Sequence, residues 1–459
     1  MSTSTPRPAT GVPALQAPVA GTLNGSGQRL YRRARELMPG GTQLLSKRPE
    51  MFLPEHWPAY YSRAAGALVW DLDGVEYLDM SYAGIGSCIL GYADRVVDRA
   101  VCDAVAQGTM CTLNCPEEVV LAELLLELHP WAERVRYARS GGEAMAVAIR
   151  IARAATGRDG IAFCGYHGWS DWYLAANLAE QSQLDGHLLP GLAPAGVPRG
   201  LAGTMHPFHY NRLDQLDAII AEHGGTLAAI VMEPVRGHDP EPGFLEGVRE
   251  RATRAGAVLV FDEITSGWRL TTGGAHLVYG VAPDVAVFAK GMSNGYPMAA
   301  IIGIAPVMEA AQSSFISSTF WTERIGPTAA LATLQRHLQD DVASHLIAMG
   351  RMVQDGWRML GERWGLPMDI GGIAPLGHFS FGLENGQAMR TLFTQLMLER
   401  GILATGAFYA MHAHQPAHVE RYLAEADDAF AILARAVAEG SVEQRLHGPV
   451  AHSGFRRLT

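Results

Sequence analysis

Lysine is rare in this chain, which makes its two lysines the first candidates for chemistry. Of 36 Lys and Arg side chains, only Lys47 and Lys290 are lysines. A guanidinium stays protonated, whereas a buried lysine amine can lose its proton and attack a carbonyl group to form an imine. Lys47 follows no predicted strand and precedes Arg48-Pro49, so we expect it at the surface or near the mouth of a substrate site. Lys290 is therefore the candidate nucleophile.

Three apolar runs in the middle of the chain end in polar residues. Glu233 follows the run 228–232, Asp262 and Glu263 follow 257–261, and Lys290 follows 285–289. In a parallel sheet the carboxyl ends of the strands meet at one edge, and ligands bind there. A single strand-end charge is usually just solvated, but this set includes one of only two lysines. It therefore predicts an active site.

These side chains are the ones that pyridoxal 5′-phosphate (PLP) requires. The cofactor needs a lysine that holds its aldehyde as an imine and a carboxylate that keeps its pyridine nitrogen protonated. Its phosphate needs backbone N–H groups, which Ser140, Gly141 and Gly142 offer where a strand meets a helix. Tyr166 follows the run 161–164 and is a candidate for stacking on the ring, although a strand-end aromatic can also pack on the core.

The pattern around these residues predicts an α/β fold with a mostly parallel sheet. From residue 134, apolar runs alternate with helical stretches at 143–155, 213–223 and 244–255, as in a sheet covered on both faces. Residues 66–80 have the pattern of a hairpin around Asp73-Gly74. After residue 326, long helices with short strands indicate a smaller α+β domain. The predicted central strands are 135–138, 161–164, 228–232, 257–261, 285–289 and 300–304.

Composition favours an enzyme of small molecules. The net charge of −10 offers no basic face for nucleic acid, and no apolar run of 18 residues predicts a membrane helix. Residues 1–25 are rich in Ser, Thr, Pro, Ala and Gly, which predicts a disordered tail without a secretory signal. Five cysteines without a CxxC pair indicate reduced thiols and a cytoplasmic location. We expect no metal site, because neither Cys111 with Cys115 nor the tract of His412, His414 and His418 has suitable partners.

The motifs together resemble the class III aminotransferases, and most closely the branch of glutamate-1-semialdehyde 2,1-aminomutase. They are Ser140-Gly141-Gly142-Glu143-Ala144, Asp262-Glu263-Ile264 and the segment 288–297, with 39–42 and 70–74 in support. The resemblance implies fold type I, with a seven-stranded, mostly parallel sheet in a large PLP-binding domain (81–330). It also implies a small α+β domain built from 26–80 and 331–459, and a homodimer whose active sites lie at the interface.

The resemblance also implies a role for each candidate by its position. Lys290 would carry PLP, Asp262 would face the pyridine nitrogen, and Tyr166 would stack on the ring. Glu233 lies where the family has an active-site glutamate. The remaining cofactor contacts implied in this way are Ser140, Gly141, Gly142 and Thr319, the last reaching the phosphate of the neighbouring subunit.

The chain departs from the family pattern in the turn that would bind the phosphate and in the residues expected around the substrate. Gly142 stands where the family usually has Thr, and Arg236 stands where many members have Gln. Trp321 follows Thr319-Phe320, where many members have small residues. We expect Arg236, Trp321 and Tyr409 to shape the substrate pocket.

The predicted activity is transfer of an amino group from a donor to a small aldehyde or ketone in two half-reactions, with pyridoxamine phosphate between them. An aminomutase or an epimerase on the same cofactor would share every motif. A nucleotide-binding dehydrogenase is disfavoured because Ser140-Gly141-Gly142-Glu143 does not fit a GxGxxG turn. A non-catalytic protein that has kept the fold is disfavoured because Asp262 and Lys290 are both present.

Overall fold

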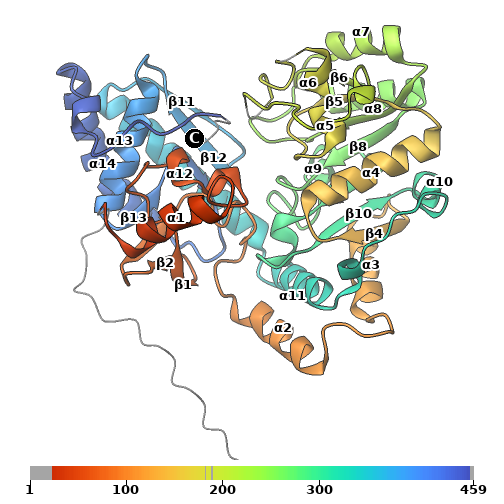
Figure 1. The fold of residues 1–459 in the computed structure, drawn as a ribbon, viewed down its shortest axis with the longest axis horizontal. Helices are drawn as coiled ribbons and strands as arrows, with labels where there is room; N and C mark the ends of the chain where they lie inside the picture. The colour runs from red at the N-terminus through yellow and green to blue at the C-terminus, as the bar shows by residue number, and fades with distance from the viewer. Residues whose placement is uncertain (1–22, 181, 188–189, 455–459) are drawn as a thin grey trace, which may run out of the picture.

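The chain forms two lobes in the computed structural model, which describes residues 23–180, 182–187 and 190–454 (Figure 1). The segments nearest the two ends of the chain, red and blue, share one lobe, and the middle of the chain forms the other. The predicted tail, 1–25, lies outside the described residues except for its last three. No helix within the described ranges is long and apolar enough to cross a membrane.

The larger lobe is built on a seven-stranded sheet with the order β4-β10-β9-β8-β7-β5-β6. Neighbouring strands are parallel except β10, which runs antiparallel to both β4 and β9. The predicted mostly parallel sheet is therefore confirmed; the short β6 was not predicted. The strands are β4 (Arg134–Ala138), β5 (Gly160–Cys164), β6 (Met205–Pro207), β7 (Leu227–Met232), β8 (Val258–Asp262), β9 (Val285–Phe288) and β10 (Ala299–Gly303).

Helices cover both faces of this sheet. Helix α4 (Gly141–Thr156) packs on one face, and α7 (Leu213–His223) and α8 (Phe244–Ala255) pack on the other. Successive side chains of a strand point to opposite faces, so Val260 of β8 packs with the α4 cluster and Leu259 with the α8 cluster. Burial on both faces explains why these strands are apolar throughout.

The remaining helices of this lobe pack at its edge. Helices α2 (Arg95–Gln107) and α3 (Glu117–Leu128) pack against α11 (Ile325–Gln339), and α11 also contacts the turn that begins at Lys290. Four short helices complete the lobe: α5 (Asp171–Leu174), α6 (Ala176–Ala179), α9 (His276–Tyr279) and α10 (Ala305–Met308).

The smaller lobe joins both ends of the chain in two sheets. One sheet has the order β1-β2-β3-β13 and the other β11-β12-β14. Strands β2 and β3 form the predicted hairpin, and Gly74 has the positive φ of 82° that its turn requires. The strands are β1 (Tyr61–Ala65), β2 (Leu68–Asp71), β3 (Glu76–Met80), β11 (Met368–Gly371), β12 (Leu376–Phe381), β13 (Ile402–Ala404) and β14 (Ala407–Tyr409).

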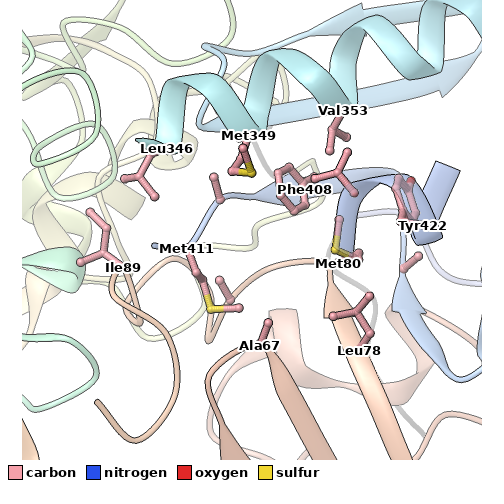
Figure 2. Packing of buried hydrophobic residues seen from close by; sticks show 14 of the residues in the cluster. Ala67, Leu78, Met80, Ile89, Leu346, Met349, Val353, Phe408, Met411 and Tyr422 are labelled. Atoms are coloured by element: carbon pink, nitrogen blue, oxygen red, sulfur yellow. The ribbon is translucent and has the colours of Figure 1, made fainter. Parts of the chain in front are cut away.

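The hydrophobic core of this lobe contains residues from both the early and the late parts of the chain (Figure 2). Strand β3 runs parallel to β13, more than 300 residues later. Leu78 and Met80 of β3 belong to the same buried cluster as Leu346, Val353 and Phe408. The exact domain boundaries stay predictions. The helices of the lobe are α1 (Ser26–Leu37), α12 (Val342–Trp364), α13 (Gly386–Glu399) and α14 (Pro416–Ala438).

Candidate active site

A cavity of about 480 Å³ lies where the carboxyl ends of β5, β7 and β9 meet the smaller lobe. From the larger lobe, Glu233 and Lys290 line it, as the strand-end pattern predicted. From the smaller lobe, His378, Arg390 and Tyr409 line it. The site is thus formed between the lobes, at the sheet edge where ligands of α/β folds bind.

Lys290 lies two residues after the end of β9 and is held in an unusual backbone conformation. Its φ of 47° lies in the left-handed region, which costs a non-glycine residue free energy and is found mostly at functional positions. Its Nζ donates a hydrogen bond to Oγ1 of Thr265 at 2.8 Å. Burial, aided by the charge of Arg236, lowers the pKa of this amine to about 8. A fraction of the amine is therefore deprotonated at neutral pH.

Asp262 ends β8 and is only 3% exposed. One carboxylate oxygen accepts a hydrogen bond from the Ile264 N–H at 3.0 Å, and the other lies 2.8 Å from Nδ1 of His167. The second ring nitrogen of His167 lies 3.1 Å from the carbonyl oxygen of Cys164. Both ring nitrogens of His167 therefore lie within hydrogen-bonding distance of oxygen atoms. The buried carboxylate is thus fixed at the end of β8 by contacts to both of its oxygens.

His167 was not predicted as a functional residue. It directly follows Tyr166, so the sequence signal that could have found it was this adjacency. Thr265, the partner of the Lys290 amine, lies three residues after Asp262 and was missed as well. Both residues hold a predicted site residue in place by a hydrogen bond.

Glu233 and Arg236 form an ion pair at the end of β7. Nη1 of Arg236 lies 3.0 and 3.3 Å from the two carboxylate oxygens of Glu233. Glu233 is 8% exposed, and both side chains line the cavity. Arg236 stands where many family members have Gln, and its charge is therefore largely neutralised by Glu233.

The glycine turn at the start of α4 packs too closely for side chains. A Cβ at Gly141 would lie 2.9 Å from Cδ1 of Ile264, and one at Gly142 would lie 2.8 Å from Nε1 of Trp169. Oε2 of Glu143 accepts a hydrogen bond from the Ser140 N–H at 3.0 Å. Residues 140–142 lie outside the lining of the cavity, and their phosphate contacts stay predictions.

The other predicted residues fall in different places. Tyr409 lines the cavity and packs edge-on against Tyr82, with ring centroids 5.3 Å apart. Tyr166 does not line it; the ring packs edge-on against Tyr173 at 5.8 Å. Trp321 packs on the α4 side of the sheet, and Thr319 is exposed. The roles of Tyr166, Trp321 and Thr319 stay predictions.

Glu263 points away from the site, although the sequence placed it beside Asp262. It is fully buried and accepts hydrogen bonds from N of His276 at 2.9 Å and from Oγ of Ser266 at 2.6 Å. Nδ1 of His276 also lies 2.8 Å from it. Neighbouring residues at a strand end face opposite sides, so only one of the two carboxylates can reach the site.

Arg269 is a buried cation near the site that the sequence did not reveal. It is 1% exposed, and its guanidinium donates to the carbonyl oxygens of Thr265 and Gly86 at 2.8 and 2.6 Å. It also lies 5.8 Å from the centre of the Tyr409 ring. Burial lowers its pKa to about 10. Arg269 thus links the Thr265 segment to Gly86 and to the Tyr409 wall of the cavity.

The donor set fits PLP. Lys290 is an amine with a lowered pKa, and Asp262 is a buried carboxylate held by hydrogen bonds. At the start of α4, Gly141 and Gly142 stand where a Cβ would clash with neighbouring side chains. These are the groups that the aldehyde, the pyridine nitrogen and the phosphate of the cofactor require.

Comparison with known proteins identifies relatives along most of the chain. The family described as aminotransferase class III matches residues 53–437. The 3-aminobutyryl-CoA aminotransferase of Cloacimonas acidaminovorans is 33% identical over 80% of this chain and 86% of its own length. The glutamate-1-semialdehyde 2,1-aminomutase of Bordetella avium is 34% identical over 88% of this chain and 98% of its own.

Solved structures give the same picture. The PLP-containing FumI protein of Sphingopyxis sp. MTA144 has a TM-score of 0.81 at 26% identity, covering 90% of this chain and 98% of its own. An omega-transaminase of Sphaerobacter thermophilus has a TM-score of 0.79 at 27% identity, covering 89% and 98%. The fold type I architecture implied by the sequence motifs is therefore confirmed.

Proposed function

Because the chain belongs to the class III aminotransferases, which use PLP, we propose that it transfers amino groups between a donor and a carbonyl acceptor in the cavity around Lys290. One observation supports the proposal that the reaction takes place in this cavity. The Lys290 amine has a pKa of about 8 and lines the same cavity as Glu233 and Arg236. An amine that gains and loses a proton near neutral pH suits general acid–base catalysis.

Each residue of the site has a separate task in this proposal. When bound, PLP supplies a carbonyl group that reacts with amines and a ring that withdraws electrons from the carbon next to the nitrogen. Lys290 removes the proton from that carbon and returns a proton through its Nζ, which the Thr265 hydroxyl orients. Asp262, which His167 and the Ile264 N–H hold in place, would be the carboxylate that keeps the ring nitrogen of bound PLP protonated.

We propose that the enzyme acts as a cytoplasmic homodimer. The phosphate would lie at Ser140, Gly141 and Gly142, and it would also contact Thr319 of the partner subunit. The exposure of Thr319 and of the neighbouring Phe320, which is 68% exposed, supports a contact at this surface. All five cysteines are free thiols, which supports a cytoplasmic location.

An aminomutase remains the second candidate function, since relatives with that name are as similar as the aminotransferases. Both half-reactions would then act on one molecule, with the same lysine and carboxylate. Turnover of a single substrate without any added donor or acceptor would favour the aminomutase. A strict requirement for two different substrates would favour the aminotransferase.

Absorbance spectra of the purified enzyme test the proposal. We expect a visible PLP band that moves toward the near-ultraviolet when an amino donor is added. Borohydride treatment should fix the cofactor to Lys290, and the variant Lys47→Ala should behave as the wild type. Absence of the band, together with no borohydride label on Lys290, would refute the proposed function.

A further inference from the structure

A second cavity, of about 430 Å³, lies beside helix α4 of the larger lobe. Side chains of α4 form one wall, and residues 169–172 form another. The cavity shares no lining residue with the cavity around Lys290. Its volume falls within the range of small-molecule sites, about 300–1,000 Å³. It is therefore a candidate binding site separate from the active site.

Two arginines of α4 give this cavity a positively charged wall. Arg150 and Arg153 both line it and are three residues apart, so they lie on one face of the helix. Arg150 donates to the carbonyl oxygen of Phe315 at 3.2 Å, and Arg153 donates to that of Asp159 at 2.9 Å. Neither guanidinium forms a salt bridge within the described residues.

Arg153 is the more confined of the two arginines. Its Nη2 is buried and has no hydrogen-bond partner in the described part of the chain. Burial lowers the pKa of its guanidinium, because nothing nearby fully compensates the charge. A phosphate or carboxylate bound in the cavity would supply both the missing acceptor and the missing negative charge.

Two tryptophans give the cavity flat apolar surfaces. Trp169 is 70% exposed, so a large aromatic ring is open to a ligand. Trp172 is 5% exposed, and its buried Nε1 has no hydrogen-bond partner among the residues described. A buried N–H without an acceptor costs free energy. Trp172 also stacks on His167, with ring centroids 6.2 Å apart, so this wall is already formed before a ligand binds.

One carboxylate, that of Asp171, also lines the cavity. It is exposed and forms no salt bridge within the described ranges. A carboxylate in such a place repels a simple anion but accepts hydrogen bonds from hydroxyl groups, as acidic residues do with ribose. The cavity thus combines positive charge for a phosphate, ring faces for a base and an acceptor for a sugar. The net charge of −10 disfavours a nucleic acid strand as the partner.

We propose that this cavity binds a nucleoside monophosphate. The base stacks on Trp169, the phosphate lies at Arg150 and Arg153, and a ribose hydroxyl group donates to Asp171. This inference goes beyond the proposed function and does not depend on it, because none of these residues has a task in the transfer of amino groups.

Calorimetric titration of the holoenzyme tests the proposal, since the bound cofactor occupies its own phosphate site. The probes are adenosine 5′-monophosphate (AMP), adenosine, ribose 5-phosphate and inorganic phosphate. The variants are Arg150→Gln, Arg153→Gln, Trp169→Ala and Trp169→Phe. Arg150 and Trp169 are exposed, so their variants should fold as the wild type does. Arg351→Gln, which replaces an exposed arginine of α12, is the matched control.

The wild type should bind AMP at one site per chain, and each of the other three probes at least about 10-fold more weakly. Arg150→Gln and Arg153→Gln should each weaken AMP binding by about 10-fold, because a charge-assisted hydrogen bond to the phosphate is lost. Both should leave adenosine binding unchanged. Trp169→Ala should weaken AMP binding by about 5- to 100-fold, and Trp169→Phe should recover most of the loss. Arg351→Gln should match the wild type.

Three outcomes would overturn the proposal. The first is a wild type that does not bind AMP, as expected if a second copy of the chain fills the cavity. The second is binding of inorganic phosphate as tight as that of AMP, which would indicate a simple anion site. The third is AMP binding that is the same in all the cavity variants as in the wild type, which would place the nucleotide elsewhere.

Discussion

The pKa of Lys290 gives a direct test of how the cavity activates its amine. Burial is the main cause of the lowered pKa of about 8, and the charge of Arg236 is the next, while Glu233 and Asp262 act in the opposite direction. Replacing Arg236 with Met removes a lowering cause and leaves Glu233 without its partner. The pKa of Lys290 in the cofactor-free protein should therefore rise in Arg236→Met.

The size of the effect follows from the two pKa values. The difference between an ordinary lysine at 10.5 and about 8 corresponds to about 3 kcal/mol. At pH 7.5 about a quarter of the Lys290 amine is then deprotonated, against about 0.1% for an unperturbed lysine. Loss of one nearby charge is worth about 1–2 kcal/mol at an effective dielectric constant near 20, which moves the midpoint up by about one pH unit.

Competitive acetylation followed by mass spectrometry measures this midpoint. The chain contains only two lysines, so Lys47 is an internal reference in every sample. Labelling of Lys290 by a limiting amount of acetic anhydride should increase with pH, reach half its maximum at about pH 8 and level off by about pH 9.5 in the wild type. In Arg236→Met the curve should shift to higher pH while the labelling of Lys47 stays the same.

Two results would refute this reasoning. If labelling of Lys290 in the wild type keeps rising to pH 10, burial does not lower its pKa as the structure requires. If Arg236→Met leaves the midpoint unchanged or lowers it, the charge of Arg236 does not act on the amine. A matching shift in the control variant Arg351→Gln, which replaces an exposed arginine of α12, would point to a general effect of lost charge.

The two neighbouring carboxylates of the β8 end should respond in opposite ways to neutral substitutions. Asp262→Asn should reduce turnover by at least about 100-fold. The free energy of unfolding in urea should stay near that of the wild type, because the amide keeps the shape of the carboxylate beside His167. Unchanged turnover would contradict the proposed role of Asp262 at the cofactor. Glu263→Ala removes the acceptor of the His276 backbone N–H and Nδ1 at a fully buried position. It should lower the free energy of unfolding, measured by urea unfolding, by about 1–3 kcal/mol, and a value near zero would contradict it. Gly141→Ala forces a Cβ against Ile264 and should cost about 1–3 kcal/mol, visible as a lower Tm.

Much of the site could be predicted because its signals are local. Asp262 and Lys290 directly follow apolar runs of the sequence, and the rarity of lysine singled out Lys290 before any motif was considered. Arg390 carries no such signal. It lies in the second turn of α13, and its place in the cavity depends on Gly406 and on the packing of the smaller lobe. Contacts between segments distant in sequence decide such positions, so a single sequence does not reveal them.

The same limit explains the errors around the strand ends. The alternation of a strand fixes that Asp262 and Glu263 face opposite ways, but the sequence does not say which of them faces the ligand. The buried partner of Glu263, His276, comes from the short helix α9, which has no clear periodicity. The short strands β6 and β11 were missed, because a run of three or four residues carries little pattern of its own.

The parallel pairing of β3 with β13 has a consequence for how the chain is made. A ribosome synthesises β3 more than 300 residues before its neighbour, so β1, β2 and β3 emerge as an isolated antiparallel group, which is marginally stable in water. The seven strands of the larger sheet are all complete by residue 303 and can assemble in the meantime. The nascent chain therefore exposes an unpaired strand edge until its last quarter is translated, and this edge is where a chaperone would be needed.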